Sequence, residues 1–114
     1  MKKLLTIALL FFSLGAFSQE RIALIIGNAD YQISALKNAL NDAQDIAKAL
    51  EELDFKVTLV ENADQKTMKK AISDFNEKLN KDTVGLFYYA GHAVQYNGEN
   101  YLIPINALNK IKTN

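Results

Sequence analysis

Apolar residues follow two kinds of pattern that alternate along this chain. Residues 21–26 and 83–89 are nearly continuous runs of strand formers, which is typical of strands buried on both faces of a sheet, and residues 55–60 predict a further short strand. Between these runs, residues 38–53 and 64–79 carry apolar side chains at the spacing of an amphipathic helix. The order β-α-β-α-β predicts an α/β fold, because right-handed crossovers between parallel strands place helices on the faces of one sheet.

Each predicted helix begins at a residue that suits a helix N-terminus. Asn38 is the expected N-cap of the first helix, and Asp42 lies in its first turn, where the helix dipole favours a carboxylate. Asp64 is the expected N-cap of the second helix. Lysines on the second helix lie away from its apolar stripe, so we interpret them as a solvated face rather than a binding patch. They are Lys66, Lys69, Lys70 and Lys78.

A β-hairpin is expected after the third strand. Residues 93–96 and 99–102 flank Asn97 and Gly98, a pair that favours the left-handed conformations of a two-residue turn. The 114 residues suffice for one small domain. Three central strands nevertheless make an incomplete sheet, in which the third strand is expected to lack one neighbour. Such an unpaired apolar edge invites self-association.

The first 18 residues predict a signal peptide outside the fold. Two lysines begin it, residues 4–12 form an apolar stretch too short to span a bilayer, and two small residues, Ala16 and Ser18, follow. Cleavage is expected between Ser18 and Gln19, which leaves residues 19–114 as part of one secreted or periplasmic domain without a membrane span. A buried amino-terminal helix is the alternative interpretation of this segment.

Composition narrows the choice of partners and cofactors. Thirteen basic and 13 acidic residues give a formal net charge of zero, so charge offers no argument for nucleic acid as a partner. One histidine and no cysteine exclude the usual zinc sites. No cofactor is predicted, and the residues do not determine whether the protein depends on calcium. Gly27 and Asn28 are interpreted as the turn that ends the first strand, since the glycine patterns of phosphate-binding loops are absent.

The only histidine, His92, comes directly after the third strand run and Gly91. In open α/β sheets, ligands bind just beyond the carboxyl ends of the strands. We therefore expect His92 to be the main candidate for acid–base chemistry. The alternative interpretation is a core or loop histidine whose ring is bonded to a backbone carbonyl.

Motifs between residues 21 and 107 resemble the amino-terminal part of a caspase-like peptidase domain, of the bacterial and metacaspase type. The resemblance rests on ALIIGN at residues 23–28, Tyr31, Leu36, NDA at residues 41–43, FYYAGH at residues 87–92 and NYLIP at residues 100–104. It implies a caspase-like three-layer αβα sandwich with a mainly parallel sheet, present here in incomplete form as β-α-β-α-β followed by a hairpin.

The resemblance also implies roles for three residues. His92 matches the histidine of the family's Cys–His dyad, and Ala93 stands at the position whose backbone N–H helps to form the oxyanion hole, where the family usually has glycine. Asp42 matches the aspartate that lines a pocket for a basic substrate residue, with stabilisation of the helix N-terminus as the alternative role. The only arginine, Arg21, lies at the start of the first strand, which disfavours recognition of aspartate.

The nucleophile is the part of the dyad that this sequence lacks. The caspase histidine precedes its cysteine by about 50 residues, whereas 22 residues follow His92 and none is cysteine. We therefore expect a truncated form or fragment that is inactive alone, whose full-length form is a cysteine endopeptidase cleaving peptide or protein substrates after Arg or Lys. The alternative is a short, non-catalytic caspase-like protein that binds a peptide or a protein partner.

Overall fold

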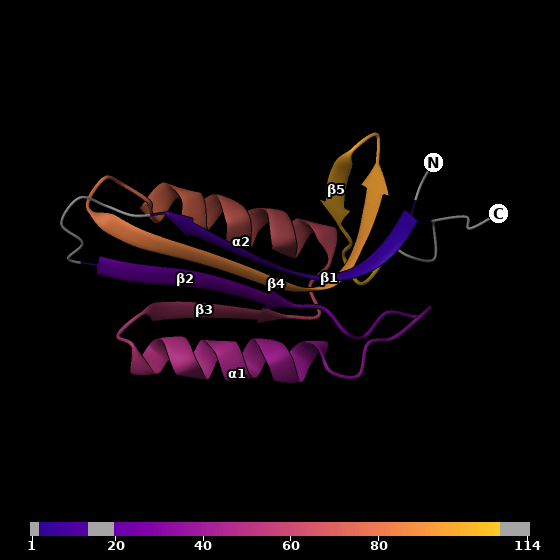
Figure 1. The fold of residues 1–114 in the computed structure, drawn as a ribbon, viewed down its shortest axis with the longest axis horizontal. Coiled ribbons are helices and arrows are strands. Elements are labelled where there is room, and N and C mark those ends of the chain that lie inside the picture. The colour runs from indigo at the N-terminus through magenta and orange to yellow at the C-terminus, as the bar shows by residue number, and fades with distance from the viewer. Residues whose placement is uncertain (1–2, 14–19, 108–114) are drawn as a thin grey trace.

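The computed structural model describes residues 3–13 and 20–107. These residues form five strands and two helices (Figure 1). The elements are β1 (Lys3–Ser13), β2 (Glu20–Gly27), α1 (Ala39–Glu52), β3 (Lys56–Glu61), α2 (Gln65–Lys78), β4 (Thr83–Tyr96) and β5 (Glu99–Leu102).

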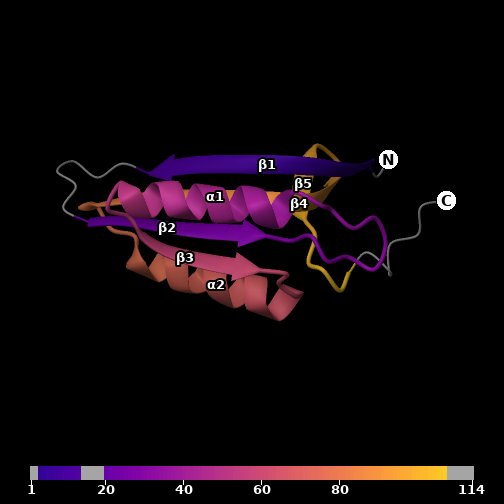
Figure 2. The same ribbon diagram turned by 90° about the horizontal axis from the view of Figure 1, so that it is seen from below.

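One sheet holds all five strands, in the order β1-β4-β2-β3 with β5 paired to β4. The pairs β2–β3 and β2–β4 are parallel, whereas β1 and β5 run antiparallel to β4. Helix α2 lies over one face of this sheet and α1 over the other (Figures 1 and 2). The predicted α/β architecture, with helices on both faces of a parallel centre, is therefore confirmed.

Strand β2 forms the centre of both hydrophobic layers. Ala23 and Ile25 pack in a cluster with residues of α1, and Leu24 and Ile26 pack on the opposite face in a cluster with Met68 of α2. All four β2 side chains are at most 2% exposed. Burying a large aliphatic side chain contributes about 1.5–3 kcal/mol, so an apolar residue at every position is what a strand covered on both faces requires.

The packing of α1 on the end of β2 depends on a glycine. A Cβ at Gly27 would lie 2.7 Å from the Cβ of Ala43, so the helix can approach this closely only because residue 27 has no side chain. Asn38 occupies the N-cap position as predicted, but its side chain makes no cap hydrogen bond. The N-cap of α2 does form its bond, since Asp64 Oδ1 accepts from the Thr67 N–H at 2.8 Å.

Strand β4 extends further than the sequence pattern predicts. We expected the strand to end near Tyr89 and His92 to follow it, but β4 continues to Tyr96. The parallel partner β2 does end, at the pair Gly27–Ala90. Beyond this point β1 and β5 flank β4 and supply the pairing that keeps its backbone extended. His92 therefore lies inside a strand.

The amino-terminal segment is also part of the sheet in the intact chain. We expected it to lie outside the fold, but β1 pairs with β4 along its whole length, from Lys3 opposite Gln95 to Ser13 opposite Gly85. An apolar segment of strand formers can satisfy the backbone groups along the edge that would otherwise be unpaired. The expected cleavage point between Ser18 and Gln19 lies outside the described residues, so removal of the segment stays a prediction.

The predicted hairpin is confirmed. Tyr96 pairs with Glu99 across the two-residue turn, and both turn residues have positive φ angles, 52° at Asn97 and 79° at Gly98. Among residues 3–13 and 20–107, no helix is long and apolar enough to cross a membrane.

Candidate active site

His92 is buried in β4, and its ring is held by a loop carbonyl. The side chain is 4% exposed, and Nε2 lies 2.6 Å from the backbone oxygen of Ser34, in the loop before α1. A carbonyl oxygen can only accept a hydrogen bond, so Nε2 must carry the proton. Ser34 has a φ of 59°, in the left-handed region that non-glycine residues adopt infrequently, and this conformation helps to orient its carbonyl.

The other ring nitrogen, Nδ1, faces the strand at the sheet edge. It lies 3.4 Å from Oγ1 of Thr6, which pairs with His92 across the β1–β4 ladder. In a neutral ring with the proton on Nε2, Nδ1 carries the lone pair and accepts from the Thr6 hydroxyl. Nδ1 is therefore the nitrogen that could take a proton from a nucleophile, and β1 covers it in the intact chain.

Two tyrosines contact the backbone of His92. The Tyr31 hydroxyl accepts from the His92 N–H at 3.1 Å, and the Tyr89 hydroxyl donates to the His92 carbonyl at 2.6 Å. The Tyr31 ring also lies against the imidazole, with centroids 4.6 Å apart and planes tilted by 57°. Burial raises the pKa of both phenols, so both stay protonated well above neutral pH. Sequence reasoning used these tyrosines only as part of a motif and missed this role.

Asn28 joins the loops around the site, although the sequence suggested only a turn. Its side chain is fully buried, and Oδ1 accepts from the Ala63 N–H at 2.8 Å while Nδ2 donates to the Ile103 carbonyl at 3.3 Å. Its backbone N–H donates to the Ala90 carbonyl at 2.9 Å. A short polar side chain directly after a buried strand was the available signal, but the three partners named above lie between 35 and 75 residues away.

Asp42 lies in the first turn of α1 and lines a pocket of about 370 Å³ on that face of the sheet. Gly91, the residue before His92, lines the same pocket, and so do Lys37 and Thr6. The fold thus brings Asp42 close to the His92 segment, although the His92 ring itself does not line the pocket. Burial, and next the nearby Asp42 carboxylate, raise the pKa of Tyr88 in the adjoining part of β4.

Ala93 is fully buried between two strands. It pairs with Leu5 of β1 on one side and with Leu102 of β5 on the other. Both of its neighbouring ladder positions are thus occupied in the intact chain. Its contribution to an oxyanion hole stays a prediction.

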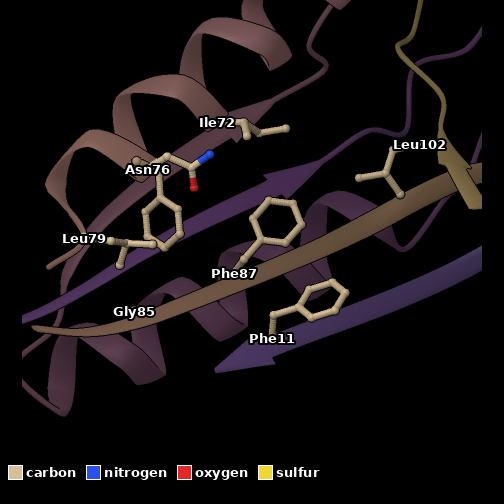
Figure 3. A pocket seen from close by; sticks show the side chains of 8 residues that line it. Phe11, Ile72, Asn76, Leu79, Gly85, Phe87 and Leu102 are labelled. Carbon is tan, nitrogen blue, oxygen red and sulfur yellow. The ribbon is translucent and has the colours of Figure 1, made fainter. Parts of the chain in front are cut away.

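A second hollow, of about 310 Å³, opens on the α2 face between α2, β4 and β1 (Figure 3). Its described lining includes the rings of Phe11 and Phe87, whose centroids are 6.3 Å apart, together with Leu79. Among the described residues that line it there is no acid, base or nucleophile. It runs beside Gly85 and Phe87, which precede His92 in β4, and has no part in the arrangement around the imidazole.

Within residues 3–13 and 20–107, no three His, Cys, Asp or Glu side chains come together in a way that could hold a metal ion. The described part of the candidate site is therefore an imidazole with its supporting hydrogen bonds and one pocket carboxylate. An imidazole with its lone pair on Nδ1 is chemically able to take a proton from a nucleophile placed beside it.

Comparison with known proteins places this arrangement in a family. The family model described as "Caspase domain" matches residues 20–114. The human Mucosa-associated lymphoid tissue lymphoma translocation protein 1 is 33% identical over 97 residues, which cover 84% of this chain and 12% of the relative. The mouse homolog of that protein gives the same identity and coverage. This chain thus spans about an eighth of the length of these curated relatives. The chain belongs to the caspase domain family.

Proposed function

We propose that this chain is the amino-terminal part of a caspase-like cysteine endopeptidase domain, of the bacterial and metacaspase type, in which His92 is the general base. The observation that carries the proposal is the hydrogen bond from Nε2 to the Ser34 carbonyl, since it leaves the lone pair on Nδ1. The sequence holds no cysteine, so the nucleophile comes from outside these 114 residues.

The proposed reaction uses Nδ1 twice. The thiol transfers its proton to Nδ1, and the thiolate attacks the peptide carbonyl carbon to form a carbon–sulfur bond. The imidazolium then returns that proton to the leaving amine as the carbon–nitrogen bond breaks. Water finally hydrolyses the thioester, which restores the thiol and releases the new carboxylate.

The proposed substrates are peptides or proteins cleaved after Arg or Lys. Support comes from Asp42, whose carboxylate lines a pocket that also reaches Gly91. A carboxylate pairs well with a guanidinium or an ammonium group, and it pairs most strongly with Arg through two hydrogen bonds. Lys37 lines the same pocket, and its positive charge would oppose a cationic substrate side chain there.

Peptide hydrolysis tests this proposal. The 114-residue chain should release no measurable product from Arg- or Lys-ending fluorogenic peptides. A protein that continues through the natural reading frame to a cysteine should cleave them, and His92→Ala should abolish cleavage. Asp42→Asn should slow cleavage of basic substrates more than of neutral ones. Turnover by the cysteine-free chain that depends on His92 would show that the thiol mechanism is wrong.

A second candidate function is peptide binding without cleavage, which the absence of cysteine from the sequence favours. In that case the Asp42 pocket would bind a basic side chain as a recognition site. Saturable binding of an Arg-containing peptide by the chain alone, weakened by Asp42→Asn, together with a reading frame that encodes no cysteine, would favour binding over catalysis.

We also propose that the protein is exported and loses its first 18 residues. Support comes from the two amino-terminal lysines, the apolar stretch and the small residues Ala16 and Ser18. Mass spectrometry of the exported protein should find a mature chain that begins at Gln19. An intact Met1 on a cytoplasmic product would contradict export.

A further inference from the structure

The backbone around His92 needs partners that the parallel sheet does not supply. The β2–β4 ladder ends at the pair Gly27–Ala90, and the Asn28 N–H takes the Ala90 carbonyl at 2.9 Å. Beyond that point β2 no longer runs beside β4. An unpaired N–H or carbonyl in a buried strand is costly, so the groups of His92 on this side require other partners.

Two tyrosine hydroxyls and the Ile103 N–H, which donates to the His92 carbonyl at 3.0 Å, take the place of the missing strand. The His92 N–H donates to the Tyr31 hydroxyl at 3.1 Å, and that hydroxyl donates to the Ile103 carbonyl at 2.8 Å. The Tyr89 hydroxyl donates to the His92 carbonyl at 2.6 Å. The two hydroxyl oxygens lie 3.2 Å apart, and both tyrosines are at most 3% exposed.

Gly91 leaves the space that the hydroxyls occupy. A Cβ built on Gly91 would lie 2.4 Å from the Tyr89 hydroxyl oxygen and 2.9 Å from that of Tyr31. Neither hydroxyl could stay in place beside such an atom. The glycine before the histidine is thus explained by the two tyrosines, since any side chain there would displace them.

We propose that Tyr31 and Tyr89 are positioning residues for His92, and this inference rests on the proposed role of His92 as the base. The two hydroxyls hold the backbone of His92, while Ser34, three residues after Tyr31 in the same loop, holds Nε2. With backbone and Nε2 both held, the imidazole keeps one orientation, with Nδ1 directed to the sheet edge. The pair therefore orients the base without touching the substrate.

Nuclear magnetic resonance can test this directly, because the chain has a single histidine and isotope-labelled histidine gives one set of ring signals. The intact chain should show the Nε2–H tautomer. Tyr31→Phe and Tyr89→Phe each remove one hydroxyl and keep the ring. Tyr31→Phe should speed hydrogen exchange of the His92 amide roughly tenfold, the expected effect of losing one hydrogen bond. Both variants should give mixed tautomers and ring signals closer to those of free histidine.

Two controls separate positioning from general stability. Tyr101→Phe removes an exposed hydroxyl that bonds only to Glu99 among the described contacts, and it should leave the His92 signals unchanged. Gly91→Ala should reproduce the effect of the phenylalanine variants. A Cβ built on Gly85, in the same strand, would lie 2.3 Å from Leu79 Cδ2, in the pocket of Figure 3. Gly85→Ala therefore introduces a comparable steric clash in β4, and it should lower the melting temperature without changing the His92 ring.

The inference is overturned if the phenylalanine variants lower the melting temperature as Gly85→Ala does but keep the intact tautomer and the intact His92 exchange rate. If Tyr89→Phe does not fold, Tyr31→Phe decides, because it keeps the bond from Tyr89 to the His92 carbonyl. These measurements need neither cysteine nor substrate. If these measurements contradict the positioning role, the proposed peptidase function is unaffected. If the peptidase assay fails, the measurements on the histidine ring can still be interpreted.

Discussion

At the scale of single residues, the chemistry of His92 depends on what each ring nitrogen faces. The Ser34 carbonyl holds the proton on Nε2, and the Thr6 hydroxyl stands 3.4 Å from Nδ1. Thr6 therefore marks a position from which a nucleophile could reach the base. Because the sequence has one histidine and no cysteine, a thiol introduced there can be studied without interference.

Thr6→Cys should place a thiol within reach of Nδ1. An adjacent imidazole that takes the thiol proton lowers the pKa of a cysteine from its ordinary value of about 8.5. At pH 6.5 we expect iodoacetamide to alkylate Thr6→Cys at least about tenfold faster than the double variant that also carries His92→Ala. The reason is that lowering the thiol pKa by one unit raises the thiolate fraction about tenfold. Equal rates in the two proteins would show that Nδ1 is not available as a base.

The buried tyrosines predict a loss of stability in alkali. Burial raises the folded-state pKa of Tyr31 and Tyr89 above the ordinary value of about 10, so the unfolded chain releases these protons first. Their contribution to the free energy of unfolding is present below about pH 10 and falls as the pH rises above it. Urea midpoints at pH 8, 10 and 11 should fall less steeply in Tyr31→Phe than in the intact chain.

The exposed Tyr101 provides the matched comparison for this titration. Solvent screens its interaction with Glu99, so Tyr101→Phe should leave the alkaline slope close to that of the intact chain. An equal reduction of the slope in Tyr31→Phe and Tyr101→Phe would contradict the assignment of the effect to burial.

At the scale of elements, the β4–β5 hairpin links a local turn to the candidate site. The turn sets the register that brings Ile103 beside His92, where the Ile103 N–H donates to the His92 carbonyl at 3.0 Å and the Ile103 carbonyl accepts from Tyr31 at 2.8 Å. A local change in the turn should therefore be felt at the histidine.

Gly98→Ala tests the turn geometry on which this register depends. Gly98 has a φ of 79° and no heavy atom within 4 Å of where its Cβ would be, so the cost is one of backbone conformation and not of space. We expect a loss of about 1 kcal/mol in the free energy of unfolding by urea. Asn97→Gly, at a φ of 52° that glycine adopts readily, should cost little. Equal losses in the two variants would argue against this turn geometry.

At the scale of the whole molecule, the amino-terminal strand decides whether the sheet has a free edge. Strand β1 covers β4 along its length, and although Leu10 and Phe11 of β1 are 58% and 59% exposed, Ile7 and Leu9 pack against the core cluster on the α2 face. Strand β1 therefore contributes ladder hydrogen bonds and part of the apolar packing on that face. Without residues 1–18, the backbone groups of β4 between Gly85 and Gln95 would lose that partner.

Residues 19–114 alone should consequently be marginally stable or self-associate through this edge. Sedimentation at micromolar concentrations should show dimers or larger species for 19–114 and a smaller tendency to associate for the intact chain. Addition of a peptide with the sequence of residues 3–13 should reduce the association, because it can pair with the same edge. A monomeric 19–114 protein that melts cooperatively would count against an exposed, adhesive edge.

The sequence alone determined the features that depend on neighbouring residues. Periodicity separated the strands of the parallel centre from the two helices, the pair Asn97–Gly98 specified the hairpin, and the motifs at residues 41–43 and 87–92, occurring in order, indicated the family. Each of these follows from local conformational preference or from a short string of residues. The limits of the elements were less certain, because the continuation of β4 depends on partners that are distant in sequence.

Only the tertiary structure decided how the histidine is held. Three partners of His92 lie far away in the sequence, 58 residues away at Ser34, 61 at Tyr31 and 86 at Thr6, and no local pattern connects such positions. The tautomer of the ring, the need for glycine at residue 91 and the occupation of the sheet edge by β1 all follow from these long-range contacts. Local preferences determine which elements form, whereas the closing of the sheet determines which side chains those elements bring together.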